Sequence, residues 1–111
     1  MECQNTDKCI SYLGSEEEVN ISLDPIDGYA MVDDDFDFTI EVYCSSLKKQ
    51  IFTKDQARKE DDGTYTVFVE TIKIGVGDVK IRVVGSVPNR SYPGKYRDVV
   101  TYLDPNMRIV R

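Results

Sequence analysis

Closely spaced aspartates are the first residues in this sequence that could do chemistry. Asp33, Asp35 and Asp37 fall within the run Asp33-Asp34-Asp35-Phe36-Asp37. Calcium takes about six to eight oxygen ligands, and loops between strands can supply them. We therefore treat these three aspartates as calcium candidates, although the run lacks the glycine and glutamate spacing of an EF-hand. The alternative interpretation is a solvated start of a strand, whose charges keep a sheet edge from pairing with other chains.

Other catalytic patterns are missing from the sequence. It contains no histidine, which removes the usual serine and cysteine triads. Gly75-Val76-Gly77 lacks the third glycine and the Lys-Ser or Lys-Thr pair of a nucleotide-binding loop, so it reads as a turn between strands. The adjacent carboxylates at 16–18 give no sign of the two distinct environments that acid–base catalysis needs. We therefore predict a protein that is not an enzyme and has no cofactor.

An aromatic and basic segment surrounds the Pro93-Gly94 turn. Tyrosine and arginine are enriched at protein-interface hot spots. The sequence thus predicts a protein-contact loop whose candidate residues are Arg90, Tyr92, Lys95, Tyr96 and Arg97. Two alternatives remain: the loop could simply lie over the end of the fold, or its tyrosines could stack on sugar rings or bases.

Charge is unevenly distributed along the chain, whose formal net charge is -6. Residues 1–47 hold 12 acids and 1 base, net -11, and residues 48–111 hold 8 acids and 13 bases, net +5. Strands that neutralise each other within one fold would explain this, and so would copies or partners that dock acidic face to basic face. The acidic total argues against nucleic acid as a partner, and no apolar run is long enough to predict a membrane span.

The cysteines predict a reduced protein. The chain has three cysteines, Cys3, Cys9 and Cys44. An odd number of cysteines cannot all be paired in disulfides within one chain. Cys44 ends an apolar alternation and is expected to be a small buried hydrophobe. With no apolar leader segment at the N-terminus, we predict three reduced thiols in a chain made in a cytoplasm.

The elements that must position these residues are predominantly strands. Valine and isoleucine are common, and period-2 alternation recurs between Asp-Gly, Gly and Pro turns. The only segment with helical character, 54–60, is at most two turns long. The predicted strands cover 10–13, 19–23, 29–32, 36–44, 50–53, 64–71, 79–83, 98–103 and 107–110.

This pattern predicts an all-β fold: a single antiparallel β-sandwich domain over residues 1–111, with a small barrel as the alternative. Residues 1–8 are polar and are expected to be a flexible or partner-ordered arm. If the strands that begin near 36 and 79 are neighbours, Asp37 and Glu41 should face Lys80 and Arg82.

Three segments together resemble a known family. They are Phe36-Asp37-Phe38-Thr39-Ile40-Glu41-Val42-Tyr43, Asp62-Gly63-Thr64-Tyr65-Thr66-Val67 and Ile74-Gly75-Val76-Gly77-Asp78-Val79-Lys80-Ile81-Arg82-Val83. Over about residues 29–103 the chain resembles small immunoglobulin-like β domains of bacteriophage structural proteins. It is similar to the N-terminal domain of phage baseplate upper proteins and to virion proteins of phages that infect gut Bacteroidales. Unlike them, it is expected to be a free-standing module, with no fibre or receptor-binding segment after the domain.

The resemblance implies an immunoglobulin-like fold and a non-enzymatic structural module of the virion. Such a module would decorate the capsid, form the base of a head fibre or serve as a tail or baseplate adaptor. It would be made in the host cytoplasm, dock to other phage structural proteins, and assemble as a homo-oligomer or in many copies. The alternatives are a free-standing ligand- or glycan-binding module that uses Tyr92 and Tyr96, and a cytoplasmic accessory protein of a mobile element.

Overall fold

The computed structural model describes residues 9–111 and is built almost entirely from strands. The all-β prediction is confirmed, while the prediction for the arm at 1–8 lies outside the described residues. The elements are, in chain order, β1 (Cys9–Tyr12), β2 (Glu16–Ile21), β3 (Asp37–Ser45), β4 (Lys48–Thr53), the 3-10 helix η1 (Lys54–Gln56), β5 (Arg58–Lys59), β6 (Tyr65–Glu70), α1 (Thr71–Ile74), β7 (Gly77–Asp78), β8 (Lys80–Pro88), β9 (Tyr96–Leu103) and β10 (Met107–Val110).

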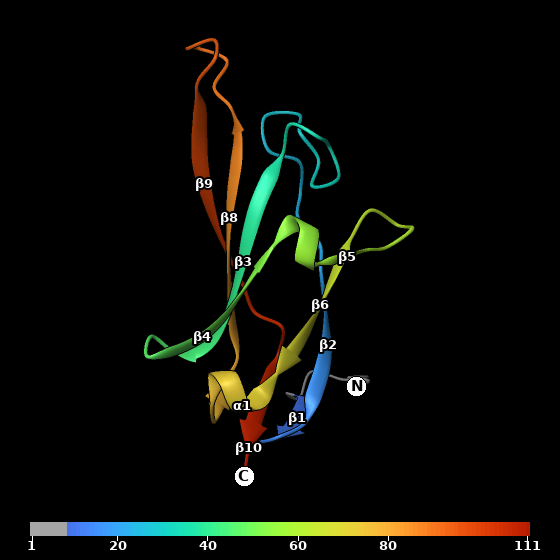
Figure 1. Cartoon of the computed structure of the whole chain (residues 1–111), viewed down its shortest axis with the longest axis vertical. Helices are drawn as coiled ribbons and strands as arrows, with labels where there is room; N and C mark the ends of the chain where they lie inside the picture. The colour runs from blue at the N-terminus through green and yellow to red at the C-terminus, as the bar shows by residue number, and fades with distance from the viewer. Residues whose placement is uncertain (1–8) are drawn as a thin grey trace.

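The strands form three hydrogen-bonded sheets. The largest has the order β4-β3-β8-β9, the second has the order β2-β6-β5, and both are antiparallel. The third has the order β1-β10-β7 and lies at the end of the molecule opposite the β8–β9 turn (Figure 1). Here β1 runs parallel to β10, which departs from the purely antiparallel prediction. The reason is connectivity: β1 and β2 belong to different sheets, so β1 is free to pair with the last strand.

One hydrophobic core joins the two larger sheets. Side chains that alternate along β3, β6 and β8 point inward and are almost completely buried, as period-2 patterning predicts. The Phe38 ring of β3 meets the Tyr65 ring of β6 edge-on, with centroids 5.1 Å apart. This contact crosses from one sheet to the other, and aromatic pairs in this geometry stabilise beyond their buried area.

A glycine in the middle of β8 makes room for the largest fully buried side chain. The ring of Phe36, which is 0% exposed, lies against Gly85 so closely that a β-carbon there would be 2.9 Å from Phe36 Cζ. Gly85 sits opposite Phe38 in the β3–β8 ladder, so backbone and ring pack without an intervening side chain.

Two predicted elements differ in the structure. Residues 29–32 are not a strand, because Asp27 and Gly28 adopt positive φ values of 52° and 84° and turn the chain back, leaving only an Ile26–Tyr29 bridge. The predicted helix at 54–60 is a three-residue 3-10 turn, after which β5 pairs with β6.

The short helix α1 was not predicted. Its first residue, Thr71, is 0% exposed and donates its hydroxyl to the Ser15 carbonyl at 2.8 Å, while the Gly14 amide donates to that hydroxyl at 2.8 Å. These long-range bonds hold a four-residue turn that local propensity alone would not form.

Replacing Gly85 with alanine should destabilise the protein, although alanine normally suits a strand better than glycine. The added methyl group meets the Phe36 ring, and overpacking of this kind costs about 1–3 kcal/mol. Urea unfolding of Gly85→Ala, with Ser86→Ala as the neighbouring control, measures the cost. In a Phe36→Leu background the cost of Gly85→Ala should shrink; an equal cost in both backgrounds would contradict the contact.

Candidate functional site

The predicted contact loop is the tip of a long hairpin. β8 and β9 pair over eight residues and project beyond the rest of the molecule (Figure 1). The tip is closed by backbone hydrogen bonds, from the Asn89 amide to the Lys95 carbonyl at 2.8 Å and from the Lys95 amide to the Tyr92 carbonyl at 3.0 Å. Gly94, with φ at 82°, supplies the left-handed residue that this turn requires. The structure thus brings all five predicted contact residues to one end of the molecule.

Two of those five residues hold the hairpin to the body of the protein. Arg97 forms an ion pair with the carboxylate of Asp27. Arg90 donates to the Asp27 carbonyl at 2.5 Å, and its guanidinium lies 5.3 Å from the centre of the Tyr29 ring. Asp27 and Tyr29 were not predicted to belong to the site. Their only local signal is the Asp27-Gly28 turn, which does not reveal a partner 70 residues away.

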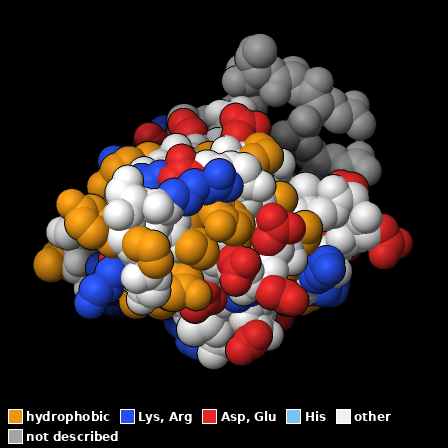
Figure 2. All heavy atoms as spheres, turned by 90° about the horizontal axis from the view of Figure 1, so that it is seen from above, with side chains coloured by type: hydrophobic (Ala, Val, Ile, Leu, Met, Phe, Trp, Pro, Cys, Tyr) orange, Lys and Arg blue, Asp and Glu red, His pale blue; other side chains and the backbone are white. Residues whose placement is uncertain are grey.

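The other three residues face solvent. Tyr92 is 66% exposed, Tyr96 is 61% exposed, and Lys95 is also exposed. Within residues 9–111 none of the three forms a side-chain hydrogen bond or ion pair. Figure 2 looks onto this end of the molecule and shows hydrophobic side chains across its left and centre, next to a group of acidic ones. Exposed tyrosines on a tethered support form a ready contact surface, because little side-chain entropy is lost on binding.

The three calcium candidates do not converge. The carboxylate of Asp33 accepts the Ala30 amide at 2.9 Å, and that of Asp37 accepts the Phe38 amide at 2.9 Å. The ammonium of Lys54 donates to the carbonyls of Asp33 and Phe36, at 2.7 and 2.6 Å. The backbone oxygens of this loop are therefore bound by a cationic side chain of the protein itself. Among residues 9–111 no group of three or more carboxylate, thiol or imidazole side chains is placed to hold a metal ion.

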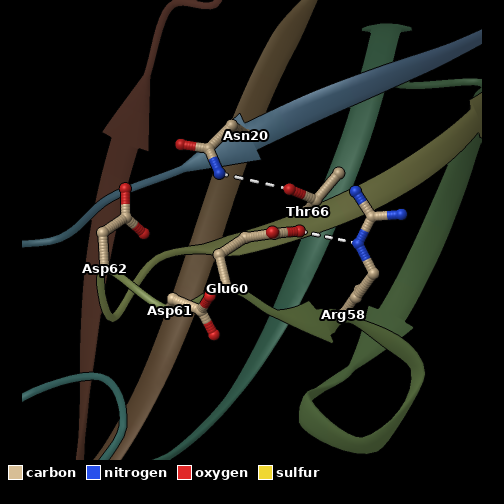
Figure 3. A pocket seen from close by; sticks show the side chains of 6 residues that line it. All are labelled: Asn20, Arg58, Glu60, Asp61, Asp62 and Thr66. Carbon is tan, nitrogen blue, oxygen red and sulfur yellow. Dashed lines mark hydrogen bonds and ion pairs between the residues drawn. The ribbon is translucent and has the colours of Figure 1, made fainter.

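A shallow polar depression lies on the other sheet, where β2, β5 and β6 meet (Figure 3). Arg58 lines this depression and pairs with Glu60 at 2.6 Å, which holds the pKa of that carboxyl below its ordinary value. The Asn20 amide donates to Thr66 at 3.1 Å. Because these groups satisfy one another, we interpret the depression as part of the fold and not as a ligand site.

The outer face of the sheet β4-β3-β8-β9 carries a nearly buried glutamate. Glu41, 8% exposed, accepts the Lys49 ammonium at 2.9 Å and forms an ion pair with Arg82. These hydrogen bonds, first from Lys49 and then from Arg82, lower the pKa of Glu41 against the opposing effect of burial.

The predicted cross-strand charge match is therefore correct for one pair only. Glu41 lies directly opposite Arg82, as expected. Asp37 lies opposite Ser86, and Lys80 lies opposite Tyr43, so the second predicted pair is wrong. In an antiparallel ladder the two basic residues of β8 run away from the acidic end of β3, which is why only one match is possible.

The prediction of three reduced thiols is wrong for Cys9, which is disulfide-bonded. Cys44 is free and half-buried, not fully buried as expected, because the β3–β4 register shifts between Tyr43 and Ser45. Its thiol donates weakly to the carbonyls of Gly75 and Gly77, and burial raises its pKa. This environment favours the unreactive thiol form.

Comparisons with protein-family models, with curated proteins and with solved structures find no match for this chain. No helix within residues 9–111 has the length and hydropathy to cross a bilayer. Function is therefore inferred from the surfaces themselves: the hairpin tip and the outer sheet face.

Asp27→Asn should loosen the hairpin without unfolding the protein. Asparagine tolerates the positive φ of this position, so the change removes the charge that Arg97 contacts and leaves the turn intact. We expect amide hydrogen exchange over residues 88–96 to become several-fold faster, while the free energy of unfolding falls by less than about 1 kcal/mol, as for other exposed ion pairs. Asp24→Asn is the control; equal exchange in both variants would refute the anchoring role.

Glu41 should make stability depend on pH. Its pKa is lowered from the ordinary value of 4.5, so its ion pairs stabilise the fold fully above that value and are lost as the pH falls through the lower folded value. Glu41→Gln should cost about 1–2 kcal/mol at pH 7, and this cost should shrink as the pH falls through the lowered pKa of Glu41. Denaturant unfolding from pH 7 to pH 2 tests this, with exposed Glu16→Gln as the control. A cost that stays constant with pH would count against the charge as its cause.

Proposed function

We propose that this chain is a non-enzymatic, immunoglobulin-like β-sandwich that acts by docking to other proteins. Strand order supports the immunoglobulin-like assignment. The sheet β4-β3-β8-β9 packs on β2-β6-β5, and consecutive strands β2 and β3 lie in different sheets. The chain returns from β6 to β8 across the end of the sandwich through α1. These crossings are typical of Greek-key sandwiches.

One observation carries the docking role: the hairpin tip is tethered to the body of the protein by two arginines, while its tyrosines face solvent. Arg90 and Arg97 hold it against Asp27, and Tyr92 and Tyr96 remain about two-thirds exposed. A contact surface held in place before binding loses less entropy when it binds.

We further propose that the partners are other structural proteins of a bacteriophage particle, and that the chain is incorporated in many copies as a capsid-decorating, head-fibre-base or tail and baseplate adaptor module. The resemblance of residues 29–103 to phage structural domains supports this role, and so does the outward-facing tip. A free-standing glycan-binding module would use the same tyrosines, and an accessory protein of a mobile element would share the fold but stay outside particles.

Quantitative mass spectrometry of purified phage particles tests the proposal. The chain should be present at a fixed ratio to the major capsid protein. The double variant Tyr92→Ala, Tyr96→Ala should reduce incorporation at least tenfold, because it removes the exposed aromatic surface of the tip.

Tyr12→Ala is the matched control for that variant. Tyr12 is equally exposed, at 64%, but lies on β1 near the opposite end of the molecule (Figure 1). Absence of the chain from particles would refute the virion role. A glycan-array signal lost in the tyrosine double variant would then establish the glycan-binding alternative.

A further inference from the structure

The outer face of the sheet β4-β3-β8-β9 carries exposed apolar side chains on its two edge strands, with the Glu41–Arg82 ion pair between them. Alternate side chains of these strands point away from the core. Among them Ile51 is 53% exposed, Val100 is 43% exposed and Tyr102 is 68% exposed. Apolar residues separated in this way are ordinary on a surface, so these three do not by themselves mark an interaction site.

Charge changes sign along the strands of this same face. At one end, a row across the sheet places Lys49 and Lys80 on either side of Tyr43. At the other end, a row places Asp37 and Asp98 on either side of Ser86. The two rows lie six positions apart along β3, which is about 20 Å at the rise of a strand. The face is therefore basic at one end and acidic at the other, and its middle holds the Glu41–Arg82 ion pair, with Ile51 on one edge strand and Val100 and Tyr102 on the other.

Such a face is complementary to itself in one orientation only. A two-fold axis that lies between two copies and runs across the strands places each basic row over the other copy's acidic row. An axis that runs along the strands would instead oppose like charges, which is destabilising. From this charge pattern we infer that the outer face binds a second copy of this chain, in an isologous dimer with its axis perpendicular to the strands.

This two-fold arrangement determines which residues of the two copies are in contact. It places Tyr102 over Val100 of the second copy and Lys80 beside Asp98 of the second copy, and each contact occurs twice by symmetry. A recess of about 220 Å³, lined by Glu41, Tyr43, Lys49 and Arg82 among others, lies where Asp37 of the second copy arrives. Two cationic side chains and one carboxylate line it, so an incoming carboxylate completes the charge balance.

The face predicts a weak dimer. Four strands about 4.8 Å apart and seven residues long give a footprint of roughly 19 by 23 Å, at the small end of specific interfaces. We therefore expect a dissociation constant of the order of 10 µM at low salt, rising severalfold in high salt as the end charges are screened. The inference goes beyond the proposed docking role and does not depend on it, since it uses only the sheet face.

Sedimentation equilibrium tests the dimer directly. The full chain is measured from about 1 to 300 µM in 20 mM and in 500 mM sodium chloride. A monomer–dimer equilibrium that weakens with salt is the expected result. A monomer at every concentration would overturn the inference and leave the face to a different protein. A dimer whose dissociation constant does not change with salt would overturn the inference that charge complementarity makes a second copy the partner.

Charge reversal identifies the orientation. Lys80→Glu alone and Asp98→Lys alone should each weaken self-association at least tenfold, because each opposes like charges twice. A mixture of the two variants should form a heterodimer about as tight as the original homodimer, since both contacts then regain opposite charges. Lys59→Glu and Asp61→Lys, exposed changes in and after β5 on the other sheet, are the controls, and thermal melts confirm that each variant folds.

Failure of the mixture to associate would overturn the proposed axis, even if each single reversal weakens the dimer. Loss of association in the control variants instead would place the interface elsewhere and also overturn the inference. Because the readout is mass in solution, its outcome is separate from incorporation into particles.

Discussion

The pairing of β3 with β8 is the constraint on which the rest of this structure depends. Every second residue of these two strands enters the core, and Gly85 leaves space there for the Phe36 ring. The same register places Glu41 opposite Arg82 on the outer face. A slip of one residue would exchange the two faces, exposing the apolar set and burying a carboxylate. Core packing and surface charge therefore select the same register, and this agreement is what makes one structure much lower in free energy than its competitors.

The unequal charge of the two halves of the sequence is partly resolved inside the fold. Acidic residues before position 48 meet basic residues after it at three places: Glu41 with Lys49 and Arg82, Asp27 with Arg97, and Glu18 with Arg58. These ion pairs, however, neutralise charge only at the places where they form. The acidic loop before β3 and the basic tip of the β8–β9 hairpin still stand at the same end of the molecule, and the outer face keeps a gradient from basic to acidic. Both surfaces proposed to bind other molecules lie where internal pairing is incomplete.

How much of this could be predicted depends on the range of the interaction. Alternation within a strand is a local signal, so the all-β class, most strands and the Glu41–Arg82 match followed from the sequence. The contact between Asp27 and Arg97 joins residues 70 positions apart through a positive-φ turn, and no spacing rule reveals it. The same turn explains why 29–32 is not a strand: its apolar residues pack on the core as a loop with no ladder partner. The disulfide at Cys9 was missed because an odd cysteine count does not say which thiols meet.

The two proposed surfaces are compatible and reinforce each other. The tip and the outer face share β9, where Tyr96 stands at their boundary. An axis across the strands turns the second copy end for end, so the two hairpin tips point in opposite directions from a shared central sheet face. A single copy extends 50 Å along its longest axis, so two partners bound at the tips would be held well apart. Weak self-association would then be strengthened whenever both tips engage fixed neighbours, because the second contact becomes effectively intramolecular. Bridging two sites through avidity in this way is the mechanical role that the proposed adaptor would have in a repeating assembly.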